Sequence, residues 1–223
     1  MSEVELVVTE DADEELVARL VAAVRAGGSI GLSGGSGPRR AYEAAAEREP
    51  DWSRAELWLV DDRCVPPADD RSNFLLLQRT ILDRVERAPR RVHRIESEHG
   101  PEAAAARYDA ELEGVRFDLA VMGIGPDGHT ASLFPNAPEL EERERRAVAA
   151  EARFEPFVPR VTTTIPFLAA SELMVYHVTG EEKADAVRRA FAAAPSPSTP
   201  SSLVRARRTV ALLDRAAAAR LHS

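Results

Sequence analysis

The sequence lacks the features that mark several classes of protein. It contains one cysteine, Cys64, so no intramolecular disulfide can form. Aromatic residues make up only 5% of the chain, which predicts a core of Val, Leu, Ile and Ala. No apolar run approaches the about 20 residues that cross a membrane. The acidic segment from Met1 to Asp13 does not resemble a secretory signal. We therefore expect a cytoplasmic protein with no membrane partner.

The sequence also has fewer basic than acidic residues. The chain has 29 Lys and Arg against 37 Asp and Glu, which gives a formal net charge of −8, and no basic stripe is visible. Because nucleic-acid-binding proteins usually carry such a stripe, we expect no nucleic-acid partner. An acidic protein that binds an anion must gather its few cations locally. Isolated Arg and Lys residues and glycine-rich turns at strand ends are therefore the candidates for a binding site.

Short apolar runs alternate with amphipathic segments along the whole chain. Strands are predicted at Val4 to Val8, Ser29 to Leu32, Glu56 to Val60, Arg91 to Ile95, Phe117 to Met122, Val161 to Ile165, Leu173 to Val178 and Thr209 to Leu213. A helix capped by Asp11 ends at Gly27, and others are predicted at Pro38 to Arg48, Asn73 to Val85, Ala103 to Leu112 and Lys183 to Ala193. An Ala-rich helix is predicted after the last strand.

This alternation predicts an α/β fold, with a mostly parallel sheet covered by helices on both faces. The length of 223 residues favours a single domain over 1–223 rather than two. In such sheets, ligands bind beyond the carboxyl ends of the strands. The segments that directly follow predicted strands are therefore the places to look for chemistry.

Two of these segments have the character of anion-binding sites. The turn after the second strand reads Ser33, Gly34, Gly35, Ser36. Glycines let backbone N–H groups approach a phosphate, and the following helix presents its positive N-terminus, although a plain tight turn is an equal alternative. Asp61 and Arg63 follow the third strand, and Arg suits bidentate recognition of phosphate, although a surface ion pair is the simpler interpretation.

The segment from Gly123 to Thr130 is the most distinctive. Its three glycines and its Asp-Gly turn hold His129 just beyond a buried strand, and imidazole is the usual general base near neutral pH. Asp127 or Asp61 would orient this imidazole, and the sequence does not choose between them. Further phosphate cations are predicted at Lys183 and Arg160, although a solvated surface side chain is the commoner role. The remaining histidines lack a comparable setting, namely His93, His99, His177 and His222.

Together these segments resemble the 6-phosphogluconolactonase family. The matching stretches are Leu32 to Ser36, Trp58 to Pro66, Ser72-Asn73, Phe117 to Pro135, Arg160 to Thr162, Gly180 to Lys183 and Leu212 to Ala217. The resemblance implies the α/β fold shared with glucosamine-6-phosphate deaminases and ribose-5-phosphate isomerases. It also implies hydrolysis of a phosphorylated sugar lactone, 6-phosphoglucono-δ-lactone, with no metal or cofactor and with His129 as the base.

Three positions depart from the family pattern. Gly37 stands where the family usually has Thr, so a hydroxyl donor to phosphate is missing. Asp62 stands where it usually has Glu, and Arg207-Arg208-Thr209 replaces a segment that often contains a bulky residue such as Trp. None of these changes removes the proposed base.

Two other functions compete with a lactonase. A sugar-phosphate isomerase or deaminase would share the fold and the phosphate cradle, but deaminases have an acid soon after the corresponding Gly-His, and here Thr130 to Pro135 contains none. A non-catalytic sugar-phosphate sensor would usually carry an effector module, for which the chain has no spare length.

The oligomeric state is open, and a monomer is compatible with the sequence. The charged loop from Asn136 to Arg146 is either a lid or, by default, surface decoration.

Overall fold

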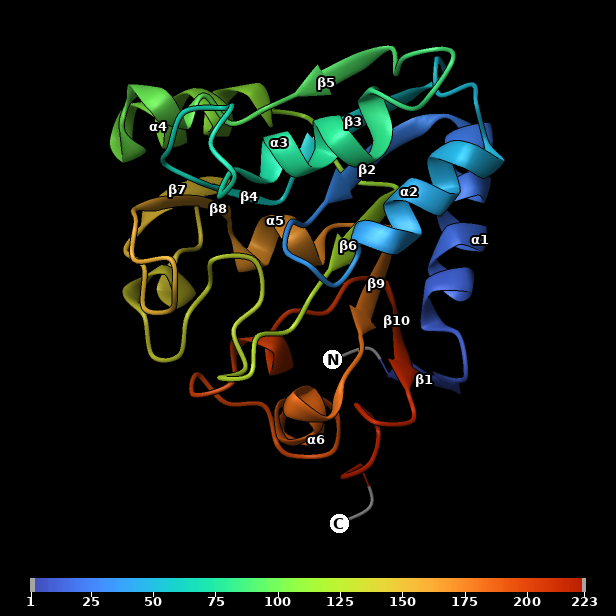
Figure 1. The fold of residues 1–223 in the computed structure, drawn as a ribbon. Helices are drawn as coiled ribbons and strands as arrows, with labels where there is room; N and C mark the ends of the chain where they lie inside the picture. The colour runs from blue at the N-terminus through green and yellow to red at the C-terminus, as the bar shows by residue number, and fades with distance from the viewer. Residues whose placement is uncertain (1–2, 222–223) are drawn as a thin grey trace.

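A computed structural model describes residues 3–221, so His222 lies outside the described part. Its centre is a seven-stranded sheet in which every neighbouring pair of strands is parallel (Figure 1). The strand order is β1 (Val4–Thr9), β10 (Arg208–Asp214), β9 (Leu173–Val178), β6 (Leu119–Met122), β2 (Gly28–Leu32), β3 (Ala55–Leu59) and β5 (Arg91–His93). The predicted parallel sheet is confirmed.

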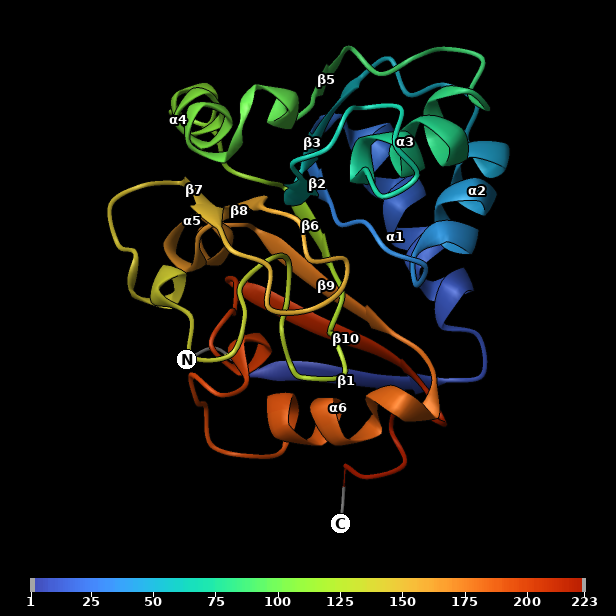
Figure 2. The same ribbon diagram turned by 60° about the vertical axis from the view of Figure 1, so that its left-hand side comes forward.

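Helices cover both faces of this sheet, as predicted (Figures 1 and 2). Two neighbouring residues of β9 show the two faces. His177 lies 3.0 Å from Asp13 of α1 (Ala12–Ala26), whereas Tyr176 packs edge-on against Phe191 of α6 (Ala184–Phe191), with ring centroids 5.5 Å apart. The remaining helices are α2 (Arg39–Arg48), α3 (Asn73–Leu77), α4 (Pro101–Glu111) and α5 (Ile165–Ala169). None of the helices among residues 3–221 is long and apolar enough to span a membrane.

Helix α1 forms where its sequence signals place it. The Asp11 side chain accepts a hydrogen bond from the backbone N–H of Glu14 at 2.9 Å, which satisfies one of the free donors at the helix start. The apolar positions at helical spacing, Leu16, Leu20 and Val24, are fully buried against the sheet. The helix ends at Gly27, whose φ of 73° suits glycine. This places the acidic first turn of α1 at the carboxyl edge of the sheet.

A second sheet was not predicted. It consists of three antiparallel strands in the order β4 (Asp61–Arg63), β8 (Arg160–Thr163) and β7 (Ala147–Ala150), and α4 packs against it. Of its strands only β8 was predicted, as Val161 to Ile165, because β4 and β7 carry too little alternation to be recognised and the pairing depends on contacts between distant segments. The consequence for the site is direct, because this pairing places Arg63 opposite Arg160.

Several predicted elements have different bounds. The strand predicted to Ile165 ends at Thr163, because α5 begins at Ile165 with Pro166 in its first turn. The helix predicted from Asn73 to Val85 is α3 followed by a π-helical turn, Gln78–Leu82. Lys183 closes a 3₁₀ turn, Glu181–Lys183, before α6. Other 3₁₀ turns are Ser97–His99, Pro138–Glu141 and Pro200–Ser202.

The Ala-rich helix predicted after the last strand is wrong. Residues 215–221 form consecutive turns rather than a helix. Helices shorter than about 12 residues are marginal on propensity alone and need packing. Here Ala217 and Leu221 are buried, but the segment is too short to bury an entire helical face.

Candidate active site

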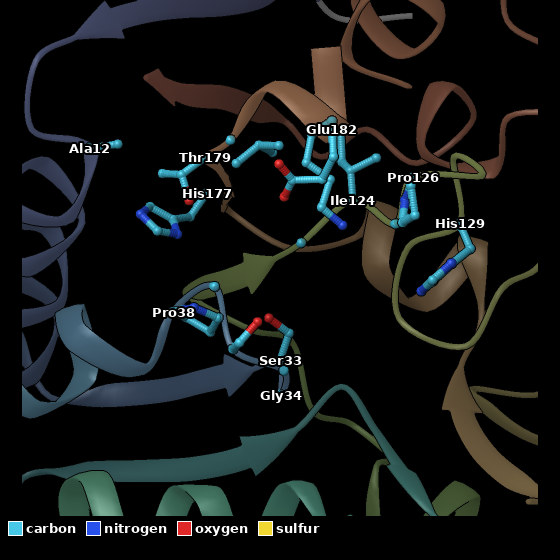
Figure 3. A pocket seen from close by; sticks show the side chains of 18 of the residues that line it. Ala12, Ser33, Gly34, Pro38, Ile124, Pro126, His129, His177, Thr179 and Glu182 are labelled. Carbon is cyan, nitrogen blue, oxygen red and sulfur yellow. The ribbon is translucent and has the colours of Figure 1, made fainter. Parts of the chain in front are cut away.

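One pocket of about 730 Å³ opens at the carboxyl ends of the central strands (Figure 3). Its wall includes nine of the ten residues predicted for the site, namely Ser33, Gly34, Gly35, Ser36, Asp61, Arg63, His129, Arg160 and Lys183. The tenth, Asp127, lies behind His129 and contacts its ring. The loops after β2, β3, β6 and β9 thus converge on one edge of the sheet, as the parallel arrangement predicts.

The turn after β6 holds His129 in a fixed position. The N–H of Gly125 donates to the carbonyl of His129, and the N–H of Gly128 donates to the carbonyl of Gly125, both at 2.9 Å. A Cβ atom on Gly125 would fall 2.1 Å from the imidazole, so only glycine fits there. Nδ1 of His129 lies 2.6 Å from Oδ1 of Asp127. With Nδ1 occupied, Nε2 is the ring nitrogen left for chemistry in the pocket.

Asp127 has an environment that favours its charged form. Burial of this carboxyl raises its pKa, but the hydrogen bond and the charge of His129 outweigh burial, so that the pKa lies below its ordinary value. An ionised Asp127 accepts the proton on Nδ1 and leaves Nε2 as the basic nitrogen. The pair therefore has the arrangement of a general base with its orienting carboxylate.

Asp61 has different partners. Its carboxylate accepts hydrogen bonds from Oγ of Ser132 at 2.6 Å and from Nδ2 of Asn73 at 3.2 Å, and the residue is buried. Among the described residues it makes no hydrogen bond to His129. Of the two acids that the sequence left open, the structure therefore pairs Asp127 with the imidazole. Asp61 remains part of the pocket wall.

The turn from Ser33 to Ser36 has the form of an anion cradle. Oγ of Ser33 is buried and has no hydrogen-bond partner, while its carbonyl accepts a hydrogen bond from the Tyr42 hydroxyl at 2.9 Å. Gly35 has a φ of 91°, and a Cβ on Gly34 would collide with the Asn73 side chain. The glycines are therefore required here, and the wall of the pocket contains a hydroxyl without a hydrogen-bond partner.

Arg63 and Lys183 bring positive charge to the same pocket. Nη1 of Arg63 donates to the Asn73 side chain, and its buried Nε has no partner. Lys183 is half-buried, and burial lowers its pKa, although the charges of Glu182 and Asp127 oppose this shift. Within residues 3–221, Lys183 forms no ion pair that would neutralise it. Both side chains keep donors available for an anion.

Arg160 reaches the pocket wall with most of its donors already used. Its guanidinium donates to the carbonyls of Phe154, Pro156 and Val158 at 3.2, 2.9 and 3.3 Å. Burial lowers its pKa below the ordinary arginine value. These bonds hold the segment 154–158 over the pocket, and the Phe154 ring centroid lies 5.5 Å from that of His129. The segment that borders the site is thus 154–158, since residues 136–146 do not line the pocket.

The departures from the family pattern have different consequences. The Asp62 carboxylate accepts from the backbone N–H groups of Asn73 at 2.6 Å and Phe74 at 3.2 Å, and so caps α3. Burial raises the pKa of Asp62 to about 6 despite these donors. Gly37 lines the pocket, and nothing lies within 4 Å of a Cβ placed there. The missing side chain at Gly37 therefore leaves open space in the pocket.

Sequence reasoning missed three residues of the site. His177 lines the far end of the pocket, with its Nε2 3.0 Å from Oδ1 of Asp13, and burial lowers its pKa (Figure 3). Asn73 connects Arg63 to the Asp61 backbone, and Phe154 packs beside His129. His177 stands at the end of a predicted strand, which was a usable signal. The other two depend on distant contacts.

Among residues 3–221, no group of three or more His, Cys, Asp or Glu side chains is placed to hold a metal ion.

Comparisons with known proteins show the family to which the chain belongs. The sequence matches the family described as glucosamine-6-phosphate isomerases/6-phosphogluconolactonase over residues 5–213. A 6-phosphogluconolactonase from Streptomyces coelicolor is 36% identical, and the match covers 95% of this chain and 90% of that relative.

Solved structures give the same result. A 6-phosphogluconolactonase from Thermotoga maritima superposes with a TM-score of 0.86 at 27% identity, and the match covers 95% of this chain and 100% of that one. A monomeric glucosamine-6-phosphate deaminase superposes with a TM-score of 0.82 at 18% identity, covering 98% and 100% of the two chains. The second likeness shows the shared fold alone.

Proposed function

The chain belongs to the glucosamine-6-phosphate isomerase/6-phosphogluconolactonase family, and we propose that it hydrolyses 6-phospho-D-glucono-1,5-lactone to 6-phospho-D-gluconate in the pentose phosphate pathway. The observation that carries this proposal is the His129–Asp127 pair, held at 2.6 Å, in a pocket that also contains a glycine-rich anion cradle. A phosphorylated lactone needs both features, one for each end of the molecule. A cytoplasmic location and the absence of a nucleic-acid partner stay predictions from the sequence.

Substrate binding is assigned to the cradle and its cations. The phosphate of the lactone binds at the Ser33 to Ser36 turn, where backbone N–H groups and the free Ser33 hydroxyl donate hydrogen bonds. Arg63 and Lys183 supply the charge that balances the phosphate. Arg160 contributes mainly by holding the segment 154–158, because three of its hydrogen bonds go to that segment. The lactone ring then extends toward His129.

The reaction needs one base that later acts as an acid. Nε2 of His129 takes a proton from water as the water oxygen attacks the lactone carbonyl carbon, and Asp127 stabilises the imidazolium that forms. The tetrahedral intermediate collapses with cleavage of the bond to the ring oxygen. His129 returns its proton to that oxygen, which becomes the hydroxyl group of the product. The proposed steps need only His129, which lines the pocket, and Asp127, which contacts its ring from behind.

The turn after His129 favours a lactonase over a deaminase. The hydroxyl of Thr130 donates to the Gly123 carbonyl at 2.8 Å, and Ser132 donates to Asp61. These side chains stabilise the turn, and no carboxylate occurs between His129 and Glu139. A deaminase would release ammonia from an amino sugar phosphate, so an ammonia assay separates the two activities.

The first test is hydrolysis of freshly generated lactone, measured against its spontaneous breakdown, by wild type and His129→Ala. Loss of a general base typically costs ~10²–10⁴-fold in rate. We expect strong acceleration by the wild type, a fall of kcat of this size in the variant, and a KM that changes little. Equal turnover in the two proteins would remove His129 from the mechanism. No acceleration by the wild type would redirect the search to ammonia release and then to binding without turnover.

A further inference from the structure

Arg189, near the end of α6, contacts the turn that carries the His129–Asp127 pair. Its Nη1 donates to the Asp127 carbonyl at 3.1 Å, and its Nη2 donates to the Pro126 carbonyl at 3.2 Å. Nη1 also donates to Oγ1 of Thr199 at 2.9 Å, and Nε donates to the Asp185 carboxylate at 2.9 Å. The guanidinium thus connects a helix, a loop and the turn before His129, yet it does not line the pocket.

The turn is packed closely against this arginine. A Cβ atom on Gly128 would lie 3.1 Å from Nη1 of Arg189 and 3.0 Å from Cγ2 of Thr199. The carbonyl of Gly128 accepts a hydrogen bond from the N–H of Ser201 at 3.0 Å. Because the turn belongs to neither a strand nor a helix, these contacts from α6 and the loop near Thr199 fix its position from behind.

The same helix begins at the wall of the pocket, which Lys183 lines. Lys183 immediately precedes α6, and Arg189 lies six positions later. At 1.5 Å per residue, this places the two backbone positions about 9 Å apart along the helix axis. One short helix therefore joins the cation assigned to the phosphate and the residue that holds the turn of the base.

We propose that Arg189 is a positioning residue for the reaction. It holds the Asp127–His129 turn against α6 and so fixes the imidazole relative to Lys183. It acts on the geometry of the base and makes no contact with substrate. The proposal rests on the proposed lactonase function for its kinetic consequences, whereas the placement of the Asp127–His129 pair is measurable without any substrate.

The test compares Arg189→Met with Arg188→Met, a matched control. Arg188 lies on the same helix, has the same charge and donates to the same acid, Asp185, at 3.2 Å. Among the described residues it makes no hydrogen bond to the turn. A misplacement of about 1 Å in a catalytic group costs about 10²-fold. We expect Arg189→Met to lower kcat by about 10- to 100-fold with KM within about twofold of wild type, and Arg188→Met to change neither.

Two further measurements separate positioning from a general loss of structure. Arg189→Lys keeps one charged donor to the turn, so it should recover part of the lost kcat. In NMR spectra of the imidazole nitrogens, the Nδ1 signal of His129 should change in Arg189→Met and stay as in wild type in Arg188→Met. Circular dichroism establishes that each variant is folded, and if Arg189→Met does not fold, the comparison is made with Arg189→Lys.

The outcomes are distinguishable. An unchanged kcat, a rise of KM that equals the fall of kcat, or an equal loss in Arg188→Met would overturn the proposal. If the wild type itself does not hydrolyse the lactone, the proposed function fails, but the NMR comparison still decides whether Arg189 holds the His129 ring. An unchanged Nδ1 signal in a folded Arg189→Met variant would by itself overturn the proposal that Arg189 positions His129.

Discussion

Two histidines line the same pocket, and each lies beside an aspartate, but their surroundings differ. His129 has its Nδ1 2.6 Å from Asp127, and 19% of its side chain is exposed. His177 has its Nε2 3.0 Å from Asp13, but only 1% of its side chain is exposed. The first ring stands on a turn beyond a strand, whereas the second lies within β9. Both rings therefore lie close to a carboxylate, and they differ in how far the side chain is exposed.

Burial explains why only one of these rings suits proton transfer. For His177, burial lowers the pKa, and the nearby charges of Asp13, Asp214 and Asp11 only partly oppose it. Its ring is enclosed, so a substrate atom cannot approach a free nitrogen closely. A general base has to lie within hydrogen-bond reach of the proton that it removes. The comparison supports the proposal that His129 is the base, and it predicts a structural role for His177.

The largest expected difference concerns the two aspartates. Asp127→Asn leaves an amide against Nδ1 and favours the wrong tautomer of His129, a change that lowers kcat by about 10⁴-fold in serine proteases. We expect a loss of at least about 10²-fold here, because the imidazole remains in place. Asp13→Asn should lower kcat by less than about threefold, because the Asp13 carboxylate lies beside the buried His177 and not beside the proposed base.

Steady-state kinetics of both variants measure this contrast directly. A large loss in Asp13→Asn would place the second pair in the mechanism and break the comparison. A small loss in Asp127→Asn would mean that the imidazole needs no carboxylate beside it. Thermal unfolding of both variants serves as the control for damage to the fold.

The second difference concerns stability and pH. Because burial lowers the pKa of His177 below 6.5, the unfolded chain takes up a proton below this pH more readily than the folded protein does. This contribution to stability is complete above the unfolded pKa and is lost as the pH falls through it. We expect the free energy of unfolding to drop more between pH 8 and pH 5 in wild type than in His177→Gln. Urea unfolding at both pH values measures the two drops.

The exposed His99 provides the control for this measurement. Half of its side chain is accessible, so His99→Gln should keep the pH dependence of the wild type. Equal drops in wild type and His177→Gln would show that protonation of the buried ring has no influence on stability. A kcat that fell strongly in His177→Gln at neutral pH would instead argue for a role in the reaction.

The sequence predicts the parallel sheet because its strands are buried on both faces and read as continuous apolar runs, as Phe117 to Met122 does. The three-stranded sheet escapes prediction because β4 and β7 have too few residues for a pattern, and because β4 and β8, which pair, lie about a hundred residues apart. The C-terminal turns escape because alanine content indicates propensity but not packing. Local signals thus give the elements, while distant pairings decide their bounds.

For the site, residue chemistry at strand ends predicts the members but not their contacts. Nine predicted residues line the pocket, yet only the coordinates show that Asp127, rather than Asp61, meets His129. The sequence predicts Arg160 as a phosphate-binding cation, but its guanidinium donates three hydrogen bonds to carbonyls of the segment 154–158. Which partner satisfies a polar side chain depends on the conformation of the turn or loop around it, and residue types alone do not determine that conformation.

The smallest expected effect concerns two phenylalanines of the segment 154–158, of which only Phe154 contacts His129. The Phe154 ring lies 5.5 Å from the imidazole, whereas Phe157, in the same segment, is 69% exposed and has no ring contact among the described residues. An aromatic pair contributes about 0.5–1.5 kcal/mol beyond its buried area. If Phe154 steadies the imidazole and limits the access of water, Phe154→Leu should lower kcat by roughly two- to tenfold. Phe157→Leu should leave kcat unchanged in the same lactone assay. Equal values for the two variants would show that Phe154 does not support the imidazole, and would leave Phe134, whose ring centroid lies 5.0 Å from that of His129, as its aromatic neighbour.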